Sequence, residues 1–235
     1  SRQLTSSGTK GKKSNIFLDK NTSFIQSRVL SHIYSDLVHK KLKIFFVDSK
    51  EVISNKIYSA RSAAIKGFFQ FVKEPEFILN SNLELNIKSI EKYLINNPNE
   101  DFILFGFTSL IYEKLLLEIE KNKTTYLFKN AILIHGGGWK KLENLNISRD
   151  FFYKRLRNTF GIKKIHNYYG MVEQTGSIFI ECEEGYFHCS NYSDILIRNK
   201  NMEVLKNGEK GLIQIFSLLP LSYPGHNILT EDIGE

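Results

Sequence analysis

Residues 131–168 read AILIHGGGWKKLENLNISRDFFYKRLRNTFGIKKIHNY, and this stretch decides the fold class. The run Ala131–Ile134 is short and apolar, as expected for a buried strand. Ser148 is a suitable N-cap for a helix that ends at Gly161. Lys164–Tyr168 then predicts a second strand. A strand, a helix and a strand in succession favour a mostly parallel sheet with helices on its faces.

The same alternation extends toward the N-terminus. Between Asn21 and Lys40, apolar residues recur every four positions, which is the spacing of one face of an amphipathic helix. Ligands of such α/β sheets bind beyond the carboxyl ends of the strands. Further helices are expected at Ala60–Phe71, Ile87–Ile95 and Ser109–Lys121, and further strands at Leu42–Val47, Phe77–Leu79 and Phe102–Phe105.

The pattern changes near Gly176. From there on, short apolar runs are separated by turn residues, and no helix-length pattern intervenes. We therefore predict an α/β core over residues 1–175 and a β-rich subdomain over residues 176–235. Its strands are expected at Ser177–Cys182, Tyr186–Cys189, Asp194–Arg198 and Gly211–Ser217.

Composition excludes several classes of protein. The chain has 235 residues, of which 42% are hydrophobic and 24% charged, so global disorder and coiled coil are excluded. The apolar run Phe102–Tyr112 is too short to span a bilayer, and no apolar leader follows a basic start, so we expect a cytoplasmic protein. The chain starts without methionine and ends on Glu235 without a closing helix. We interpret it as a piece of a longer protein.

The charge and the cysteine content indicate less about the function of the protein. The net charge is +7, and lysines cluster at Lys10–Lys13, Lys40–Lys43 and Lys121–Lys129. Because no aromatic–basic module accompanies them, a solvated surface is favoured over a nucleic-acid interface. Cys182 and Cys189 form neither a disulfide framework nor a zinc motif, and neither has an obvious setting that lowers a thiol pKa.

Two glycine-rich stretches suit phosphate or nucleotide binding. Residues 5–14, TSSGTKGKKS, combine hydroxyls, glycines and lysines, which suits an anion cradle, although the spacing is not that of a P-loop. The alternative is a polar terminus without a ligand. His135-Gly136-Gly137-Gly138-Trp139 follows a strand, where glycines allow a flat ligand to approach the backbone. A tight turn without a ligand is equally consistent.

Two acidic residues at the ends of strands are candidates for ligand binding. Glu173 follows the strand that ends near Tyr168, and one carboxylate oxygen there would suit Mg²⁺ carried by nucleotide phosphates. A solvated loop glutamate is the alternative. Asp232 suits a ribose diol. His135 and His166 lie beside apolar strands, and we interpret both as core or rim histidines rather than catalysts.

In this order, the segments resemble the adenylate-forming enzymes, which include acyl-CoA ligases, luciferases and peptide-synthetase adenylation domains. Residues 6–11, SSGTKG, resemble the phosphate loop of that superfamily, and Tyr169-Gly170-Met171-Val172-Glu173 resembles its Tyr-Gly-x-Thr-Glu motif. Gly208-Glu209-Lys210-Gly211 and Thr230-Glu231-Asp232 match two further motifs. Residues 135–142, 59–61 and 222–232 are most similar to the acyl-protein synthetase (LuxE) branch.

The resemblance implies ATP-dependent activation of a carboxylic acid, taken to be a fatty acid, to an acyl-adenylate. A thiol of a protein or of coenzyme A would then take the acyl group, with acyl-transferase or reductase partners. ATP and Mg²⁺ are the implied cofactors, and the chain would be part of the superfamily's N-terminal domain. Its nucleotide- and acyl-binding core would be residues 1–175.

The resemblance also assigns roles to residues. Glu173 would bind Mg²⁺ and, with Thr9, serve catalysis, while Tyr169 would stack on adenine beside Gly170 and Asp232 would bind the ribose. The β- and γ-phosphates would be held by Ser6, Ser7, Gly8, Thr9 and Gly11. The adenine would face the backbone of Gly136, Gly137 and Gly138, and the acyl pocket would be lined by Phe105, Gly106 and Phe107.

Some positions depart from the superfamily pattern. Lys10 replaces a threonine of the phosphate loop, Val172 replaces the threonine before Glu173, and Glu231 replaces a glycine. The small C-terminal domain with its catalytic lysine would begin after Glu235. The alternatives are an acyl- or aryl-CoA ligase and a degenerate nucleotide-binding module without catalysis.

Overall fold

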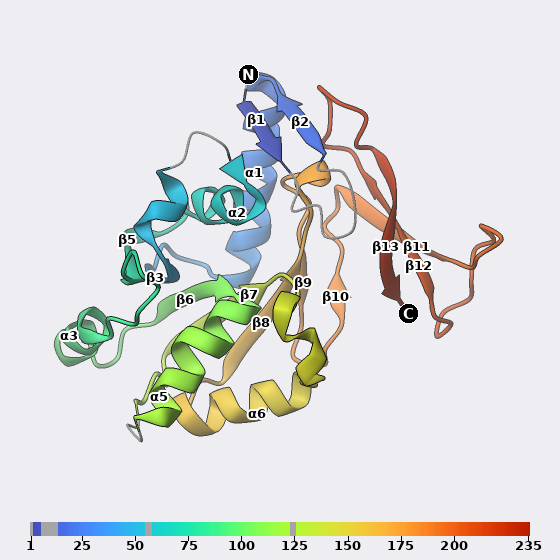
Figure 1. Cartoon of the computed structure of the whole chain (residues 1–235). Coiled ribbons are helices and arrows are strands. Elements are labelled where there is room, and N and C mark those ends of the chain that lie inside the picture. Colours follow the sequence, from blue (N-terminus) through green and yellow to red (C-terminus); the bar gives the residue numbers. More distant parts are fainter. Residues whose placement is uncertain (1, 6–13, 55–57, 123–125) are drawn as a thin grey trace.

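The computed structural model describes residues 2–5, 14–54, 58–122 and 126–235 (Figure 1). Within these residues, the centre of the molecule is a seven-stranded sheet in the order β10-β9-β8-β7-β6-β3-β5. Five neighbouring strands are parallel, and β9 and β10 are antiparallel to their neighbours. The predicted, mostly parallel sheet is therefore confirmed. The strands are β3 (Lys43–Ser49), β5 (Lys73–Leu79), β6 (Phe102–Phe107), β7 (Ala131–Gly136), β8 (Lys164–Tyr169), β9 (Phe179–Glu181) and β10 (Phe187–His188).

Helices cover both faces of this sheet. Alternate strand residues point to opposite sides, so Ile103 and Phe105 belong to one apolar core and Phe102 and Leu104 to the other. The first core packs against α1 (Lys20–Leu37) and α2 (Ala60–Phe68). The second core packs against α3 (Lys88–Asn96), the π-helical segment η2 (Ile111–Leu116), α5 (Leu117–Lys121) and α6 (Arg149–Phe160). The single turn α4 (Thr108–Leu110) directly precedes η2.

The expected helix ends are confirmed where a local signal exists. The Ser148 side chain accepts a hydrogen bond from the Phe151 N–H at the start of α6, and Gly161 ends the helix with a φ of 69°. Ser59 caps α2 in the same way through the Ser62 N–H. The helix expected over Ser109–Lys121 is present but contains the wide turn η2. Its apolar residues still face the sheet, so periodicity alone does not distinguish this segment from a regular helix.

The β-rich part differs from the sequence prediction in how its strands are grouped. The strands expected after residue 176 exist, but β9 and β10 extend the central sheet. A separate antiparallel sheet consists of β11 (Ser193–Arg198), β12 (Gly211–Ser217) and β13 (Asn227–Gly234), of which β13 was not expected. The change of sheet therefore falls between β10 and β11, while the domain boundary near residue 176 stays a prediction.

A third small sheet lies beside α1 and α2 (Figure 1). It pairs β1 (Arg2–Thr5) with β2 (Asn15–Leu18) and β4 (Tyr58–Ser59). The Ser222 hydroxyl donates to the Phe17 carbonyl at 3.1 Å and ties this sheet to the C-terminal part. The short helical segments are η1 (Lys50–Ile53), η3 (Lys140–Leu145) and η4 (Val172–Gln174).

Membrane-spanning helices need about 20 apolar residues. Among the residues that the structure describes, none of the helices combines that length with sufficient apolar character.

Gly106 provides a test of this packing. A Cβ added there would lie 2.9 Å from the Val47 Cβ and 3.0 Å from the Ile111 Cγ1, both in the closed core. We expect Gly106→Ala to lower the free energy of unfolding by about 1–3 kcal/mol, measured by urea denaturation. Gly67→Ala in α2 is the control, because its Cβ would meet only the movable Leu30 Cδ2 at 3.2 Å and alanine favours helix. Equal losses in the two variants would contradict the packing described.

Candidate active site

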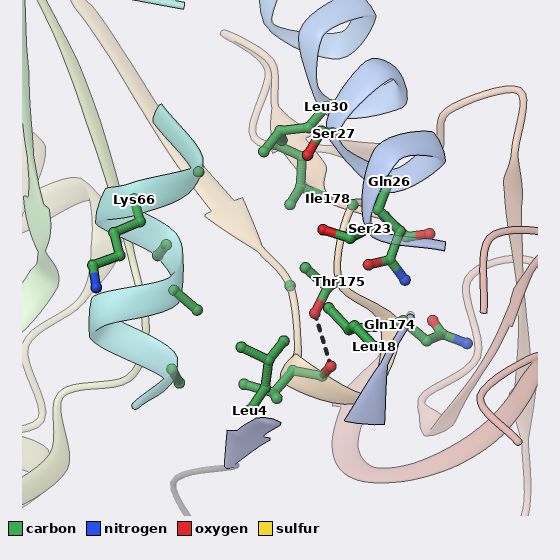
Figure 2. A pocket seen from close by; sticks show the side chains of 18 of the residues that line it. Leu4, Leu18, Ser23, Gln26, Ser27, Leu30, Lys66, Gln174, Thr175 and Ile178 are labelled. Atoms are coloured by element: carbon green, nitrogen blue, oxygen red, sulfur yellow. Dashed lines mark hydrogen bonds between the residues drawn. The ribbon is translucent and has the colours of Figure 1, made fainter. Parts of the chain in front are cut away.

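A cavity of about 1070 Å³ opens between α1, α2 and the carboxyl end of β8. Leu4 and Leu18 of the small β1-β2 sheet line one part of it, and the segment that follows β8 lines another. Figure 2 shows Ser23, Gln26 and Ser27 projecting from α1 on one side and α2 on the other. The cavity therefore lies where ligands of parallel α/β sheets are expected to bind.

The α2 wall of the cavity contains four small residues beside the larger Lys66 and Phe68. Ala60, Ala63, Ala64 and Gly67 recur along one face of the helix and line the cavity. Small side chains at these positions leave the space open, and Phe68 lines it further along the same helix. Such a wall suits an apolar ligand of substantial length.

Of the predicted acyl-pocket residues, Phe107 lines this cavity. Phe105 and Gly106 are not among its lining residues. Phe105 is fully buried beneath it and stacks on Tyr168 with ring centroids 5.8 Å apart. Gly106 packs against Val47 and Ile111. Phe105 and Gly106 therefore support the cavity from behind its lining, and the assignment of the three residues to an acyl pocket stays a prediction.

The three glycines after β7 accommodate aromatic rings of the protein. A Cβ at Gly136 would lie 2.4 Å from Tyr168 Cε1, and one at Gly137, whose φ is 74°, would lie 2.7 Å from Phe107 Cδ1. Gly137 also lines the cavity, and Gly138 is exposed. Close packing therefore explains Gly136 and Gly137 without a ligand, and an approach of adenine to this backbone stays a prediction.

Tyr169 and Asp232 meet between two sheets. The Tyr169 hydroxyl donates to Asp232 Oδ2 at 2.6 Å, which connects the end of β8 to β13. Burial and the Asp232 carboxylate raise the pKa of Tyr169 above its usual value, so the phenol stays protonated. Phe179 and Phe187 flank its ring at centroid distances of 6.0 and 6.5 Å. The structure thus brings together two residues predicted to bind one nucleotide.

Glu173 lies in η4, immediately after the Tyr169-Gly170 pair. Its carboxylate is half-buried and contributes to raising the pKa values of Tyr169 and Tyr223, so its charge acts on both phenols. The neighbours of Glu173 are fixed, because Val172 packs on Leu4 and Leu18. Gly170 lines the cavity, whereas Glu173 does not. Among the described residues, no group of three or more His, Cys, Asp or Glu side chains is arranged to hold a metal ion.

The predicted phosphate loop lies outside the described residues. Ser6, Ser7, Gly8, Thr9 and Gly11 fall between β1 and β2 in the sequence.

A buried polar network behind the glycine loop was not predicted as a unit. Thr108 Oγ1 lies 2.9 Å from His135 Nδ1 and donates to the Gly136 carbonyl at 3.2 Å. On the other side, His135 Nε2 lies 3.0 Å from the Tyr153 hydroxyl, which donates to Glu181. Arg149 pairs with the same carboxylate. The interpretation of His135 as a satisfied core histidine is confirmed.

The network fixes the loop from below. His135 is 3% exposed and Glu181 is 2% exposed. Because both side chains are shielded from water, they form their hydrogen bonds with other protein groups. The Asn167 backbone N–H also donates to Glu181 at 3.2 Å, which joins β8 to the same carboxylate. The residues come from α4, β7, α6, β8 and β9 and are far apart in the sequence. In the sequence, the only indication of this network was the apolar run that surrounds His135.

The expectation for Cys182 is wrong in one respect. The β9-β10 hairpin brings His188 to the thiol, and their hydrogen bond, together with the Tyr186 backbone, lowers the pKa of Cys182. For Cys189, burial raises the thiol pKa. Both cysteines are free.

His135 yields a pH prediction. Burial, with the charges of Arg149 and His166, lowers the pKa of His135 from 6.5 to about 3. Below pH 6.5 the unfolded chain therefore binds a proton at this residue that the folded protein does not bind. This contribution to stability is complete above pH 6.5 and falls by about 1.4 kcal/mol per pH unit toward pH 3.

The pH dependence of unfolding in urea tests this assignment. The difference in unfolding free energy between the wild type and His135→Gln is expected to shrink as the pH falls from 6.5 to 4. A difference that is constant over this range would contradict a neutral, buried His135.

Comparison with solved structures defines the class of the fold. ATP-bound MatB from Rhodopseudomonas palustris superposes with a TM-score of 0.64 at 14% identity, over 99% of this chain and 45% of that chain. The O-succinylbenzoate coenzyme A synthetase MenE of Bacillus subtilis gives 0.60 at 14% identity, over 99% and 46%. A luciferase-like enzyme from Zophobas morio gives 0.63 at 16% identity, over 99% and 54%. The fold is that of about half of an adenylate-forming enzyme.

Sequence comparison defines the family. The family model described as acyl-protein synthetase, LuxE, matches residues 1–235, so the chain belongs to this family. It is 26% identical over 246 residues to the long-chain-fatty-acid–luciferin-component ligase of Aliivibrio fischeri, covering 98% of this chain and 62% of the relative. For the ligase of the same name from Vibrio harveyi, the identity is 25% over 143 residues, covering 60% and 38%. The chain thus spans less than two thirds of either relative. The predicted resemblance is confirmed.

Proposed function

We propose that the protein activates a carboxylic acid with ATP and transfers the acyl group to a thiol, as an acyl-protein synthetase. The single observation that carries this proposal is the juxtaposition of a large cavity with the Tyr169–Asp232 pair at one edge of the sheet. Gly170 lines the cavity directly beside Tyr169, so an acid in the cavity and a nucleotide at the pair would meet there. The names of the Aliivibrio and Vibrio relatives support a fatty acid as the substrate.

The acyl chain would occupy the space between α1 and α2. Its volume of about 1070 Å³ exceeds that of common small-ligand pockets, and the small residues of α2 leave room for an apolar chain. Phe107 and Tyr168 line it where they pack against Gly137 and Gly136. The carboxylate would then face the carboxyl edge of the sheet, where the nucleotide residues lie.

The nucleotide would bind outside the cavity, along β8 and β13. Tyr169 presents a ring that is held in place by Asp232, Phe179 and Phe187. Asp232 retains a second carboxylate oxygen for a ribose hydroxyl, and residues 6–11 would hold the phosphates. ATP bound to MatB and to MenE supports this assignment at the level of the shared fold.

Glu173 is the residue that we assign to Mg²⁺. A single hard carboxylate oxygen suits a metal that keeps waters and takes its other ligands from phosphates. When bound, Mg²⁺ would neutralise charge on the phosphates. Thr9 would add a hydroxyl donor to the same phosphates.

The reaction would proceed in two steps. In the first, a carboxylate oxygen of the acid attacks the α-phosphorus of ATP, the bond to the β-phosphate oxygen breaks, and pyrophosphate leaves. In the second, a thiolate attacks the acyl carbonyl carbon and AMP leaves with the electron pair of the broken bond. The protein aligns the reactants and stabilises charge at the α-phosphorus. The acceptor would be a thiol of a partner protein or of coenzyme A.

Acid-dependent exchange between ATP and labelled pyrophosphate, in the complete protein, tests the first step. We expect Glu173→Gln to lower the exchange rate about 100-fold, because one charged group at the phosphates is lost. Glu184→Gln is the matched control, since it removes the same charge from an exposed turn, and should exchange at the wild-type rate. Wild-type exchange in Glu173→Gln, or none in the wild type with any acid, would contradict the proposal.

A further inference from the structure

The two helices that border the cavity meet at one of its ends. Leu30 of α1 and Gly67 of α2 both line the cavity. A Cβ added at Gly67 would lie 3.2 Å from the Leu30 Cδ2, so the leucine side chain reaches the backbone of the other helix. Figure 2 shows Leu30 at one end of the cavity and Leu4 at the other. The contact between Leu30 and Gly67 therefore bounds the space between the helices at the end opposite Leu4.

Beyond this contact, the helices pack directly on each other. Tyr34 follows Leu30 by about one turn of α1, and its ring contacts Phe68 edge-on at a centroid distance of 6.0 Å. The same ring stacks on Phe71 at 5.4 Å. All three aromatic residues are buried, and Tyr34 and Phe71 do not line the cavity. A ligand between the helices therefore cannot extend past Leu30 without displacing a close-packed core.

The opposite end of the cavity lies on the side where the proposed function places the nucleotide. Leu4 of β1 lines this end, and residues 6–11, which we assign to the phosphates, follow β1 directly in the sequence. Because the carboxylate has to meet the α-phosphorus, an acid in the cavity would direct its alkyl chain away from Leu4. The wall along which that chain would lie rises about 10 Å between Ala60 and Gly67 of α2.

The size of the side chains at the far end decides how much room the chain has there. Gly67 has no side chain, and Ala63 and Ala64 carry single methyl groups, so α2 leaves the space open. Leu30 is the large apolar residue that α1 contributes at this end. An apolar pocket discriminates by about 10- to 200-fold for one added or missing methylene, because an extra group meets a wall and a missing group leaves a void.

We propose that Leu30 and Gly67 select the length of the alkyl chain of the acid, because their contact bounds the part of the cavity that the end of the chain reaches. This rests on the proposed function, since it specifies which acid the same cavity accepts. The preferred acid is then the one whose terminal methyl group reaches Leu30 and Gly67 without displacing them.

Acid-dependent pyrophosphate exchange in the complete protein tests this selection. The probes are octanoic, dodecanoic, hexadecanoic and eicosanoic acids, which differ only in chain length. We expect kcat/KM to rise to an optimum and then to fall about tenfold or more for the next longer acid. Values that are independent of length, or that rise up to eicosanoic acid, would overturn the inference while the proposed function stands. If no acid supports exchange, both are overturned.

Two variants with opposite expected effects locate the selection. Leu30→Ala removes the side chain that bounds the cavity, so the optimum should move to a longer acid. Gly67→Leu adds a side chain at the same end, so the optimum should move to a shorter one. The measured quantity is the ratio of kcat/KM for two acids in one variant, which we expect to change about tenfold in each direction. A general loss of activity cancels in this ratio.

Leu37→Ala is the matched control, because it makes the same change in the same helix. Leu37 is half-buried against the core that contains Tyr34 and does not line the cavity, so its variant should keep the wild-type optimum. The assignment is overturned if Leu30→Ala and Gly67→Leu both keep the wild-type optimum, or if Leu37→Ala moves it as far as Leu30→Ala does. Should one of the two cavity variants not fold, the other decides.

Discussion

Burial of both faces of the parallel strands is the constraint on which the rest of the molecule depends. β3, β6 and β7 are almost entirely buried, and their alternate residues enter two separate cores. Helices must then cover both faces, and every crossover returns the chain so that these strands end at one edge. Loops with no common sequence motif therefore converge there, including the glycine loop after β7 and the segment after β8.

The meeting of these loops at one edge does not by itself fix the positions of their side chains. Buried polar contacts hold those side chains in place. Glu181 joins Tyr153, Arg149 and the Asn167 backbone below the edge, and His135 extends this network to the glycine loop. Above the edge, the Tyr169–Asp232 hydrogen bond ties the central sheet to the C-terminal sheet. The cavity and the residues proposed to bind a nucleotide are thus held by contacts from both sheets, as preorganised binding requires.

Local sequence signals, such as helix caps, predicted much of the fold. Contacts between residues far apart in the sequence were not predicted. Ser148 and Gly161 set the ends of α6 through backbone geometry that a few residues determine, and they were found from the sequence. The grouping of β9 with the central sheet depends on long-range pairing, for which the sequence offers no local cue. Likewise, Gln26 lies 148 positions from Gln174, and nothing in either neighbourhood indicates that they share one cavity.

The predicted binding roles of the site residues stay predictions, but the structure shows which of these residues lie together. Tyr169 and Asp232 were assigned to one nucleotide from separate motifs and lie in hydrogen-bond contact. Of the three residues assigned to an acyl pocket, Phe107 lines the cavity, whereas Phe105 and Gly106 do not. The central claim is that one edge of the sheet binds acid and nucleotide together. Its most direct test is thermal unfolding of this chain with a non-hydrolysable dodecanoyl-adenylate mimic. At 100 times its Kd the mimic should add about 2.7 kcal/mol of stability, more than adenosine or dodecanoic acid alone at the same concentration. An unchanged unfolding temperature, or a shift no larger than that with adenosine, would contradict the claim.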